Sequence, residues 1–127
     1  MAECVVDASA ILALLHFERG ADKAAEAVRK GVVSVVNLAE VWSKLFETGH
    51  TVQQARQAVG GLTLKIADFT AEDAFEIGRL RPGTRAFGLS LGDRACLALA
   101  LRLSLPVITA DRRWAKLDIG ATIELIR

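Results

Sequence analysis

Short runs of apolar, largely β-branched residues alternate along this chain with longer segments of helical character. The run at 32–36 (VVSVV) is almost entirely apolar, as is typical of a strand buried on both faces of a parallel sheet. Further strands are predicted at 3–7, which ends in Asp7, and at 64–67, 106–109 and 123–126. Strands that alternate with helices predict a parallel, doubly wound α/β sheet, with the segment 123–126 as a strand at its edge.

The helical segments differ in how much apolar surface they carry. Helices are predicted at 8–17, 20–30, 37–46, 51–59, 70–80, 90–103 and 111–117. Segment 90–103 is apolar on nearly all sides and should be central and buried. The two helices within 37–59 are predicted to be an insertion between strands. Pro82-Gly83 predicts the end of the helix at 70–80, and a basic loop is expected at 79–85.

Length and composition describe a single domain, 1–127, with a full hydrophobic core. Hydrophobic residues make up 52% and the net charge is only +1, so any binding of nucleic acid must come from a local site. Cys4 and Cys96 lie in apolar runs without metal-ligand spacing, which favours a reducing cytoplasmic location. The longest apolar run, 95–101, is too short to cross a membrane, so we expect no membrane association.

Acidic residues follow three of the predicted strands. Asp7 ends the first strand, Glu40 comes shortly after 32–36, and Asp111 follows 106–109. A fourth acid, Asp93, lies in the first turn of the apolar helix at 90–103. Open α/β sheets bind ligands at the carboxyl ends of their strands, so we expect these acids to converge there.

Each acid also has a purely structural explanation. Asp7 and Asp111 could cap the helices that follow them. Asn37-x-x-Glu40 and Ser90-x-x-Asp93 both have the spacing of a capping box, which requires no function. The convergence of all four at one sheet edge is what favours a shared site.

Several carboxylates in one pocket need compensating charge. Two carboxylates about 4 Å apart repel by roughly 4 kcal/mol at an effective dielectric constant of 20. Hard oxygen ligands without His or Cys favour Mg²⁺ or Mn²⁺ over zinc, and such sites mostly act on phosphates. The adjoining polar side chains, expected to support the acids, are Ser9, Asn37, Ser90 and Thr109.

Four segments in order, 5–10 (VVDASA), 37–41 (NLAEV), 89–95 (LSLGDRA) and 107–112 (VITADR), carry a family resemblance. With these segments the chain resembles the PIN-domain ribonucleases over essentially its whole length, most closely the VapC-type toxins of toxin–antitoxin pairs. The resemblance implies a PIN-like α/β/α sandwich with a mainly parallel central sheet. It also implies an endoribonuclease that requires Mg²⁺ or Mn²⁺.

The resemblance assigns Asp7, Glu40, Asp93 and Asp111 to the family's acidic quartet, as both metal ligands and catalytic residues. It further implies a homodimer and a VapB-like antitoxin that covers the pocket. We expect the quartet to hold one or two ions that activate a water for in-line attack on the phosphate, leaving 5′-phosphate and 3′-hydroxyl ends.

Basic residues close in sequence to the Asp93 and Asp111 motifs are candidates for contacts to RNA phosphates. They are Arg81, Arg85, Arg94 and Arg112, with Arg79 and Arg113 nearby. The alternative is a solvated basic loop.

Trp42 and Phe46 lie on the apolar stripe of segment 37–46. They either belong to the core or line a groove that takes an antitoxin helix. His16 and His50 lie outside the motifs and are predicted to be structural.

Three other functions compete with this interpretation. A phosphoacceptor receiver domain would need an adjacent acid pair after the first strand and a lysine after a late strand. Here Asp7 stands alone and Lys116 lies within a predicted helix. A housekeeping RNA-processing nuclease and a PIN-like nucleic-acid-binding module without catalysis both remain open at this stage.

Overall fold

The central sheet has five strands, and every pair of neighbouring strands is parallel. The computed structural model describes residues 1–127, with the strands in the order β3-β2-β1-β4-β5. Their bounds are β1 Cys4–Val6, β2 Gly31–Ser34, β3 Lys65–Ala67, β4 Val107–Thr109 and β5 Ile123–Leu125. The predicted parallel sheet is therefore confirmed, and its last strand lies at an edge.

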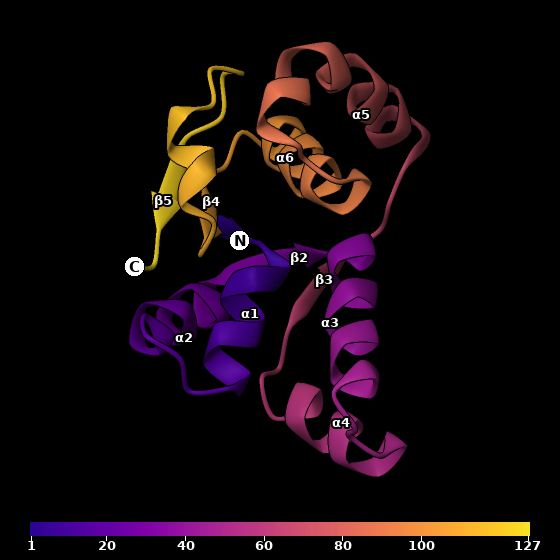
Figure 1. The fold of residues 1–127 in the computed structure, drawn as a ribbon, viewed down its shortest axis with the longest axis vertical. Coiled ribbons are helices and arrows are strands. Elements are labelled where there is room, and N and C mark those ends of the chain that lie inside the picture. The colour runs from indigo at the N-terminus through magenta and orange to yellow at the C-terminus, as the bar shows by residue number, and fades with distance from the viewer.

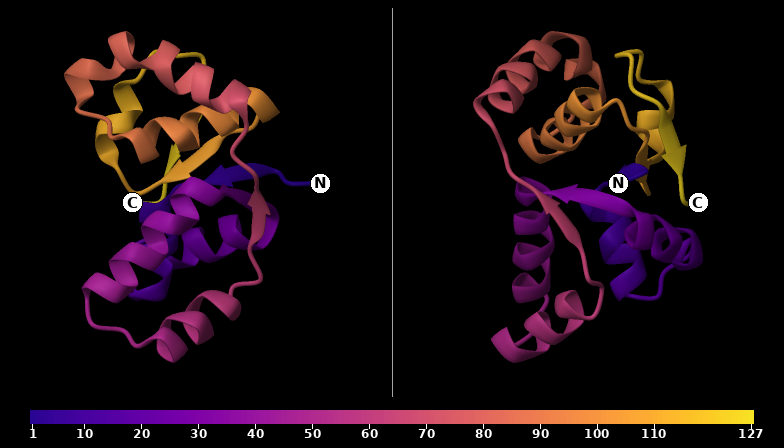
Figure 2. Two further views of the ribbon diagram at one scale, coloured as in Figure 1. Left: turned by 90° about the vertical axis from the view of Figure 1, so that its right-hand side faces the viewer. Right: turned by 180° about the vertical axis from the view of Figure 1, so that it is seen from behind.

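Helices cover both faces of this sheet. They are α1 Ala8–Leu15, α2 Ala21–Lys30, α3 Val35–Glu47, α4 Val52–Gly60, α5 Ala71–Thr84 and α6 Leu91–Leu103, with short 3-10 helices η1 Arg85–Phe87 and η2 Arg112–Lys116. Figure 1 shows α1 to α4 on one side of the strands and α5 and α6 on the other. The two further views in Figure 2 show the same layers, which form the predicted α/β/α sandwich.

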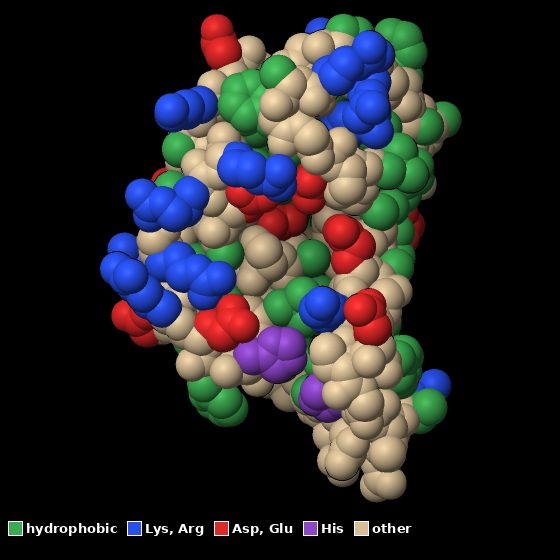
Figure 3. Space-filling view, in the orientation of Figure 1, with side chains coloured by type: hydrophobic (Ala, Val, Ile, Leu, Met, Phe, Trp, Pro, Cys, Tyr) green, Lys and Arg blue, Asp and Glu red, His purple; other side chains and the backbone are tan.

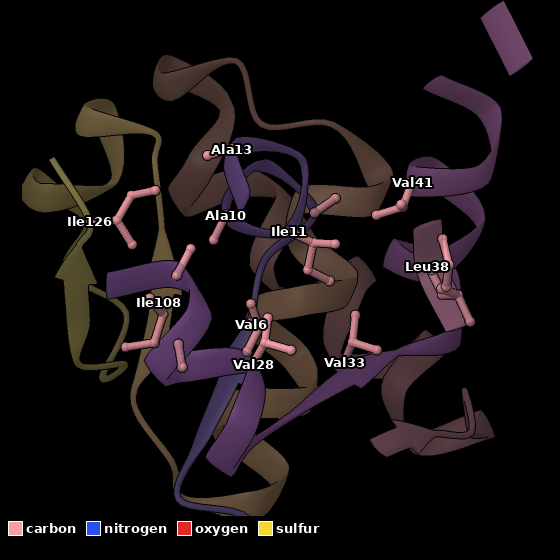
Figure 4. Close-up of a cluster of buried hydrophobic side chains, with 14 of the residues drawn as sticks. Val6, Ala10, Ile11, Ala13, Val28, Val33, Leu38, Val41, Ile108 and Ile126 are labelled. Carbon is pink, nitrogen blue, oxygen red and sulfur yellow. The ribbon is translucent and has the colours of Figure 1, made fainter. Parts of the chain in front are cut away.

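The alternation of side chains along β1 divides the core in two. Cys4 and Val6 join a cluster with α1, α2 and α3, part of which is drawn in Figure 4. Val5 points the other way, into a cluster formed mainly by α6 with Trp114 of η2. Because helices cover both faces, every residue of β1 is buried, as expected of a central parallel strand.

The predicted strand at 32–36 is wrong at its end. β2 stops at Ser34, and Val35 and Val36 already belong to α3. The Ser34 side chain accepts a hydrogen bond from the backbone N–H of Val36 at 3.2 Å, which caps the helix. Two valines that favour a strand by propensity are thus helical because a cap directly precedes them.

The predicted stop at Pro82-Gly83 is also wrong, because α5 continues to Thr84 and makes the expected basic loop at 79–85 mostly helical. A proline within a helix leaves the carbonyl four residues earlier without its N–H donor. Here that residue is the exposed Gly78, whose carbonyl can reach water and which has open space around it. Leu80 and Thr84 are both buried, so packing holds the last turn in place.

The remaining elements follow the predicted order with small shifts at their ends. α6 is the buried helix that was expected, since seven of its residues are inaccessible to solvent. The pair α3 and α4 is inserted between β2 and β3, as predicted. None of the helices is both long enough and apolar enough to span a membrane.

Candidate active site

Asp7 lies where β1 ends and α1 begins, at the carboxyl edge of the sheet. It holds the N-cap position of α1 but makes no capping hydrogen bond. Its Oδ2 instead accepts hydrogen bonds from Ser9 Oγ at 2.6 Å and from Thr109 Oγ1 at 2.9 Å. Only 4% of Asp7 is exposed, so two hydroxyl groups, one from the first turn of α1 and one from the end of β4, hold a buried carboxylate.

The same two hydroxyls tie the ends of β1 and β4 together. Ser9 Oγ accepts from the backbone N–H of Ala110 at 2.9 Å, and Thr109 Oγ1 accepts from that of Asp111 at 3.0 Å. The orientation of Asp7 therefore depends on the pairing of β1 with β4, and two of the four predicted supporting residues, Ser9 and Thr109, contact it.

Glu40 is held in place by two buried residues. Asn37 Nδ2 donates to Glu40 Oε1 at 2.6 Å and to the backbone carbonyl of Gly92 at 2.9 Å, which joins α3 to α6. A Cβ atom on Gly92 would lie 2.5 Å from the Glu40 carboxyl group. Glycine is therefore required there for the carboxylate to lie against the start of α6. The capping-box explanation for Asn37 and Glu40 fails, since Ser34 caps this helix.

Asp93 has the structural role that its spacing suggested. The backbone N–H of Ser90 donates to Asp93 Oδ2 at 2.9 Å, and Ser90 Oγ accepts from the backbone N–H of Asp93 at 3.0 Å. This is a complete capping box at the start of α6. Only one carboxylate oxygen of Asp93 is used by the cap.

These three carboxylates influence one another electrostatically. Burial raises the pKa of Asp7 to about 6; hydrogen bonds from Ser9 and Thr109 oppose this, and the charges of Asp93 and Glu40 add to it. Burial also raises the pKa of Glu40, and the charge of Asp93 contributes. Asp7, Glu40 and Asp93 are therefore close enough to repel one another, and none of them has a Lys or Arg partner within ion-pair distance.

Asp111 is arranged differently from the other three acids. Its Oδ2 accepts from Arg113 Nη2 at 2.6 Å, and Oδ1 accepts from Arg113 Nε and from the Arg113 backbone N–H, both at 3.0 Å. The hydrogen bond from the Arg113 side chain is the main cause that lowers the pKa of Asp111. The fourth acid thus caps η2 and is neutralised by an arginine.

The donor chemistry fits a hard divalent cation. Asp7, Glu40 and Asp93 offer oxygen atoms only, and each has one carboxylate oxygen without a hydrogen bond. Asn37 Oδ1 is also buried without a partner. As arranged here, however, no three His, Cys, Asp or Glu side chains are close enough together to form a preassembled metal site. The uncompensated charge, rather than a finished coordination shell, is what suits Mg²⁺ or Mn²⁺.

The other predicted site residues are dispersed. Arg81, Arg85 and Arg112 are exposed. Arg94 is half-buried and donates to the carbonyl of Ile77 at 3.0 Å, so it joins α6 to α5 instead of pointing freely into solvent.

Two aromatic pairs lie outside the acidic site. Trp42 is half-buried against the core and stacks on Phe46, which is 46% exposed, with ring centroids 6.3 Å apart. His16 and His50 lie 6.4 Å apart, between the end of α1 and the α3–α4 turn.

Sequence reasoning missed Gly92 and Cys96. Gly92 gives no signal other than its place directly before Asp93 in a helix, where glycine is unfavourable. Cys96 is fully buried beneath the acids, and its thiol pKa is raised well above its usual range, first by burial and then by the charges of Asp7, Asp93 and Glu40. The surface over this region is shown in Figure 3, where acidic side chains gather in a hollow between α6 and the α1–α3 side, with basic side chains beside them.

Comparison with known proteins identifies the family of this fold. The family model for the PIN domain matches residues 4–120. The chain belongs to the PIN domain family. No curated protein sequence matches.

Solved structures extend the comparison. A toxin–antitoxin complex from Klebsiella pneumoniae matches with a TM-score of 0.75 at 22% identity, over 98% of each chain. DNA-bound VapBC from Salmonella typhimurium matches with a TM-score of 0.76 at 17% identity, over 100% of each chain. VapBC-5 from Mycobacterium tuberculosis gives a TM-score of 0.65 at 27% identity, over 100% of this chain and 99% of that one. The resemblance to PIN domains of the VapBC type is therefore confirmed.

Proposed function

We propose that this PIN domain is an endoribonuclease that requires Mg²⁺ or Mn²⁺ and acts as the toxin of a toxin–antitoxin pair. The observation that carries the proposal is the set of Asp7, Glu40 and Asp93, three mutually repelling carboxylates without a cationic partner at the carboxyl edge of the sheet. A fold tolerates such repulsion when a bound cation relieves it.

The chain's own residues hold these carboxylates in fixed orientations. Ser9 and Thr109 use one oxygen of Asp7, Asn37 uses one oxygen of Glu40, and the α6 cap uses one oxygen of Asp93. The other oxygen of each carboxylate is left for a ligand. A bound Mg²⁺ or Mn²⁺ would stabilise negative charge on a phosphodiester and supply an activated water.

Asp111 would complete the set only if it gives up part of its contact with Arg113. Its assignment as a fourth ligand is therefore the part of this proposal that requires a side-chain rearrangement. Asp7, Glu40 and Asp93 need none to present a free oxygen.

An antitoxin partner is supported by the similar structures, which belong to toxin–antitoxin systems. An antitoxin that covers the acidic site would keep the nuclease inactive, and the stacked pair of Trp42 and Phe46 on α3 offers it an apolar contact. We also propose a homodimer. The buried, unpaired thiols of Cys4 and Cys96 suit a reducing cytoplasm.

The test is a cleavage assay on labelled structured RNA, with Mg²⁺ or Mn²⁺ and then with EDTA. Wild-type protein should cut only with metal, and Asp7→Ala and Asp93→Asn, purified in the same way, should not cut. Asp22→Asn, which changes an exposed acid on α2, serves as the matched control and should retain activity. Cleavage that persists in both site variants would show a contaminating nuclease, and binding without cleavage would favour the non-catalytic PIN module.

A further inference from the structure

A basic groove lies beside the acidic site, between η1 and η2. It has a volume of about 680 Å³ and is lined by Ala86, Phe87, Gly88, Arg112, Arg113 and Lys116. No acidic side chain lines this groove. Two other surface pockets that contain lysine or arginine also contain carboxylates, one on α2 and β5 and one on α5 and α6.

The cations in the groove differ in how far they are engaged. Arg112 and Lys116 are exposed, and neither forms an ion pair with an Asp or Glu side chain. Arg112 Nη1 donates to the main-chain oxygen of Arg127 at 3.0 Å, which leaves its other guanidinium N–H groups available. Arg113 is paired with Asp111. The buried indole of Trp114 anchors η2 to the core, so the free cations are displayed on a fixed element.

Arg113 connects this groove to the acids. Its Nη1 donates to the carbonyl of Phe87 at 3.0 Å, while its Nε and Nη2 contact Asp111. The hydrogen bond to Asp111 raises the pKa of the Arg113 guanidinium, and the charge of Asp93 adds to this rise. The groove therefore begins where the acidic site ends, with one side chain as the common wall.

Phe87 gives the groove a second kind of surface. The ring is half-buried against the cluster around α6, and Gly88 beside it has a φ of 63°, in the left-handed region, which turns the chain back toward α6. An aromatic face next to free cations is the combination that binds single-stranded nucleic acid, where bases stack and phosphates pair with Lys and Arg. An acidic peptide would use the cations but not the ring.

We propose that the η1–η2 groove is a subsite for single-stranded RNA: Arg112 and Lys116 bind a backbone phosphate next to the cleaved one, and Phe87 contacts a base. This inference rests on the proposed nuclease function and names the path of its substrate. It also explains how a site with three uncompensated carboxylates can attract a polyanion, since the neighbouring groove offsets their charge.

The experiment measures binding of a short fluorescent oligouridylate by anisotropy in EDTA, so that no cleavage is needed. Arg112→Ala/Lys116→Ala should weaken binding by roughly tenfold and reduce the salt dependence of log K by about 0.7 per lost phosphate contact. Arg56→Ala/Lys65→Ala removes one arginine and one lysine from exposed positions on α4 and β3 and should bind like the wild type. Phe87→Leu, which keeps an apolar side chain against the core, should weaken binding by about fivefold.

Equal losses in the two double variants, or no detectable binding by the wild type, would overturn the subsite. The subsite would also be overturned, in favour of an acidic protein segment, by a polyglutamate peptide that binds as tightly as the oligouridylate and whose binding is lost in Arg112→Ala/Lys116→Ala. Failure of the nuclease is separate, because it appears as absent metal-dependent cleavage by a protein that still binds RNA through the groove.

Discussion

The starts of α3 and α6 carry the same sequence pattern and use it in opposite ways. Ser90 and Asp93 form a complete capping box. Asn37 and Glu40 have the same spacing, but α3 begins two residues before Asn37 and is capped by Ser34. Asn37 is then inside the helix and fully buried, where it holds Glu40 against Gly92 of α6.

The comparison shows that spacing alone does not reveal the role of an acid at a helix start. At α6 the acid contributes to helix stability and still offers one free oxygen. At α3 the acid contributes nothing to the cap, and burial raises its pKa. Asp7 at the start of α1 resembles Glu40 in that its side chain makes no capping hydrogen bond, although Asp7 holds the N-cap position.

The largest expected effect is on catalysis. Although the two acids differ in their role at the helix start, substituting either one should lower RNA cleavage to a similar extent. Glu40→Gln and Asp93→Asn should each lower metal-dependent RNA cleavage by at least about 100-fold, since several kcal/mol of charge stabilisation depends on the bound ion. Initial rates on one labelled RNA measure this. Glu47→Gln, an exposed acid in the last turn of α3, is the control. A variant at either site that cuts at the wild-type rate would remove that acid from the site.

The next largest effect is on metal-free stability and concerns Asp7. Its pKa is raised from 3.8 to about 6 in the folded protein, so the folded state favours the protonated form. The stabilisation is present below pH 4 and is lost as the pH rises through 6. At pH 8 the ionised form costs roughly 3 kcal/mol.

Asp7→Asn should therefore be more stable than the wild type in EDTA at pH 8, with a difference that shrinks toward pH 4. Urea unfolding at several pH values measures this. Added Mg²⁺ should stabilise the wild type and not the variant. Asp22→Asn, at an exposed position on α2, is the matched control. A loss of stability in Asp7→Asn at pH 8 would contradict the assigned pKa shift.

A smaller effect is expected from a substitution at Gly92, where α6 meets Glu40 of α3. Gly92→Ala places a methyl group against the Glu40 carboxylate, which must move away from Asn37. Helix propensity favours alanine by about 1 kcal/mol, and this gain offsets the cost of displacing the Glu40 carboxylate. The free energy of unfolding should therefore change little. Metal affinity should fall by about 10-fold or more, as for a lost supporting contact.

Titration with Mn²⁺ followed by calorimetry reports the affinity. Gly78→Ala, at an exposed position in α5 with open space around it, gains the same helix propensity and should leave the affinity unchanged. Unchanged Mn²⁺ affinity in Gly92→Ala would show that the close contact with Glu40 has no functional role.

The smallest effect tests which residues are the true caps. Ser34→Ala and Ser90→Ala should each lower the free energy of unfolding by about 1 kcal/mol, because both hydroxyls cap a helix. Ser43→Ala, in the exposed middle of α3, should be near neutral. Urea unfolding in EDTA measures the stability of all three variants. If Ser34→Ala is as stable as the wild type, Asn37 and not Ser34 would be the N-cap of α3.

The comparison of the two helix starts also shows how far prediction from sequence reached. Strand order and the length of α5 depend on contacts that are distant in sequence, whereas the end of β2 depends on a local cap by Ser34. Val35 and Val36 favour a strand locally but are helical after the Ser34 cap, and Pro82 remains inside α5 because Leu80 and Thr84 are buried. Gly92 could not be identified, since its role is to make room for a residue 52 positions earlier.

The local pattern was enough to predict the class of fold and to select the acids as candidates, because alternating strands and helices must bury both sheet faces and strand ends must converge at one edge. How the acids differ depends on the folded structure. It placed Asp7, Glu40 and Asp93 within mutual repulsion and gave Asp111 to Arg113. Packing brings Thr109 to Asp7 and Gly92 to Glu40 from distant parts of the chain, whereas Asp111 pairs with Arg113 two residues away. Spacing along the chain does not encode which of these partners each carboxylate meets.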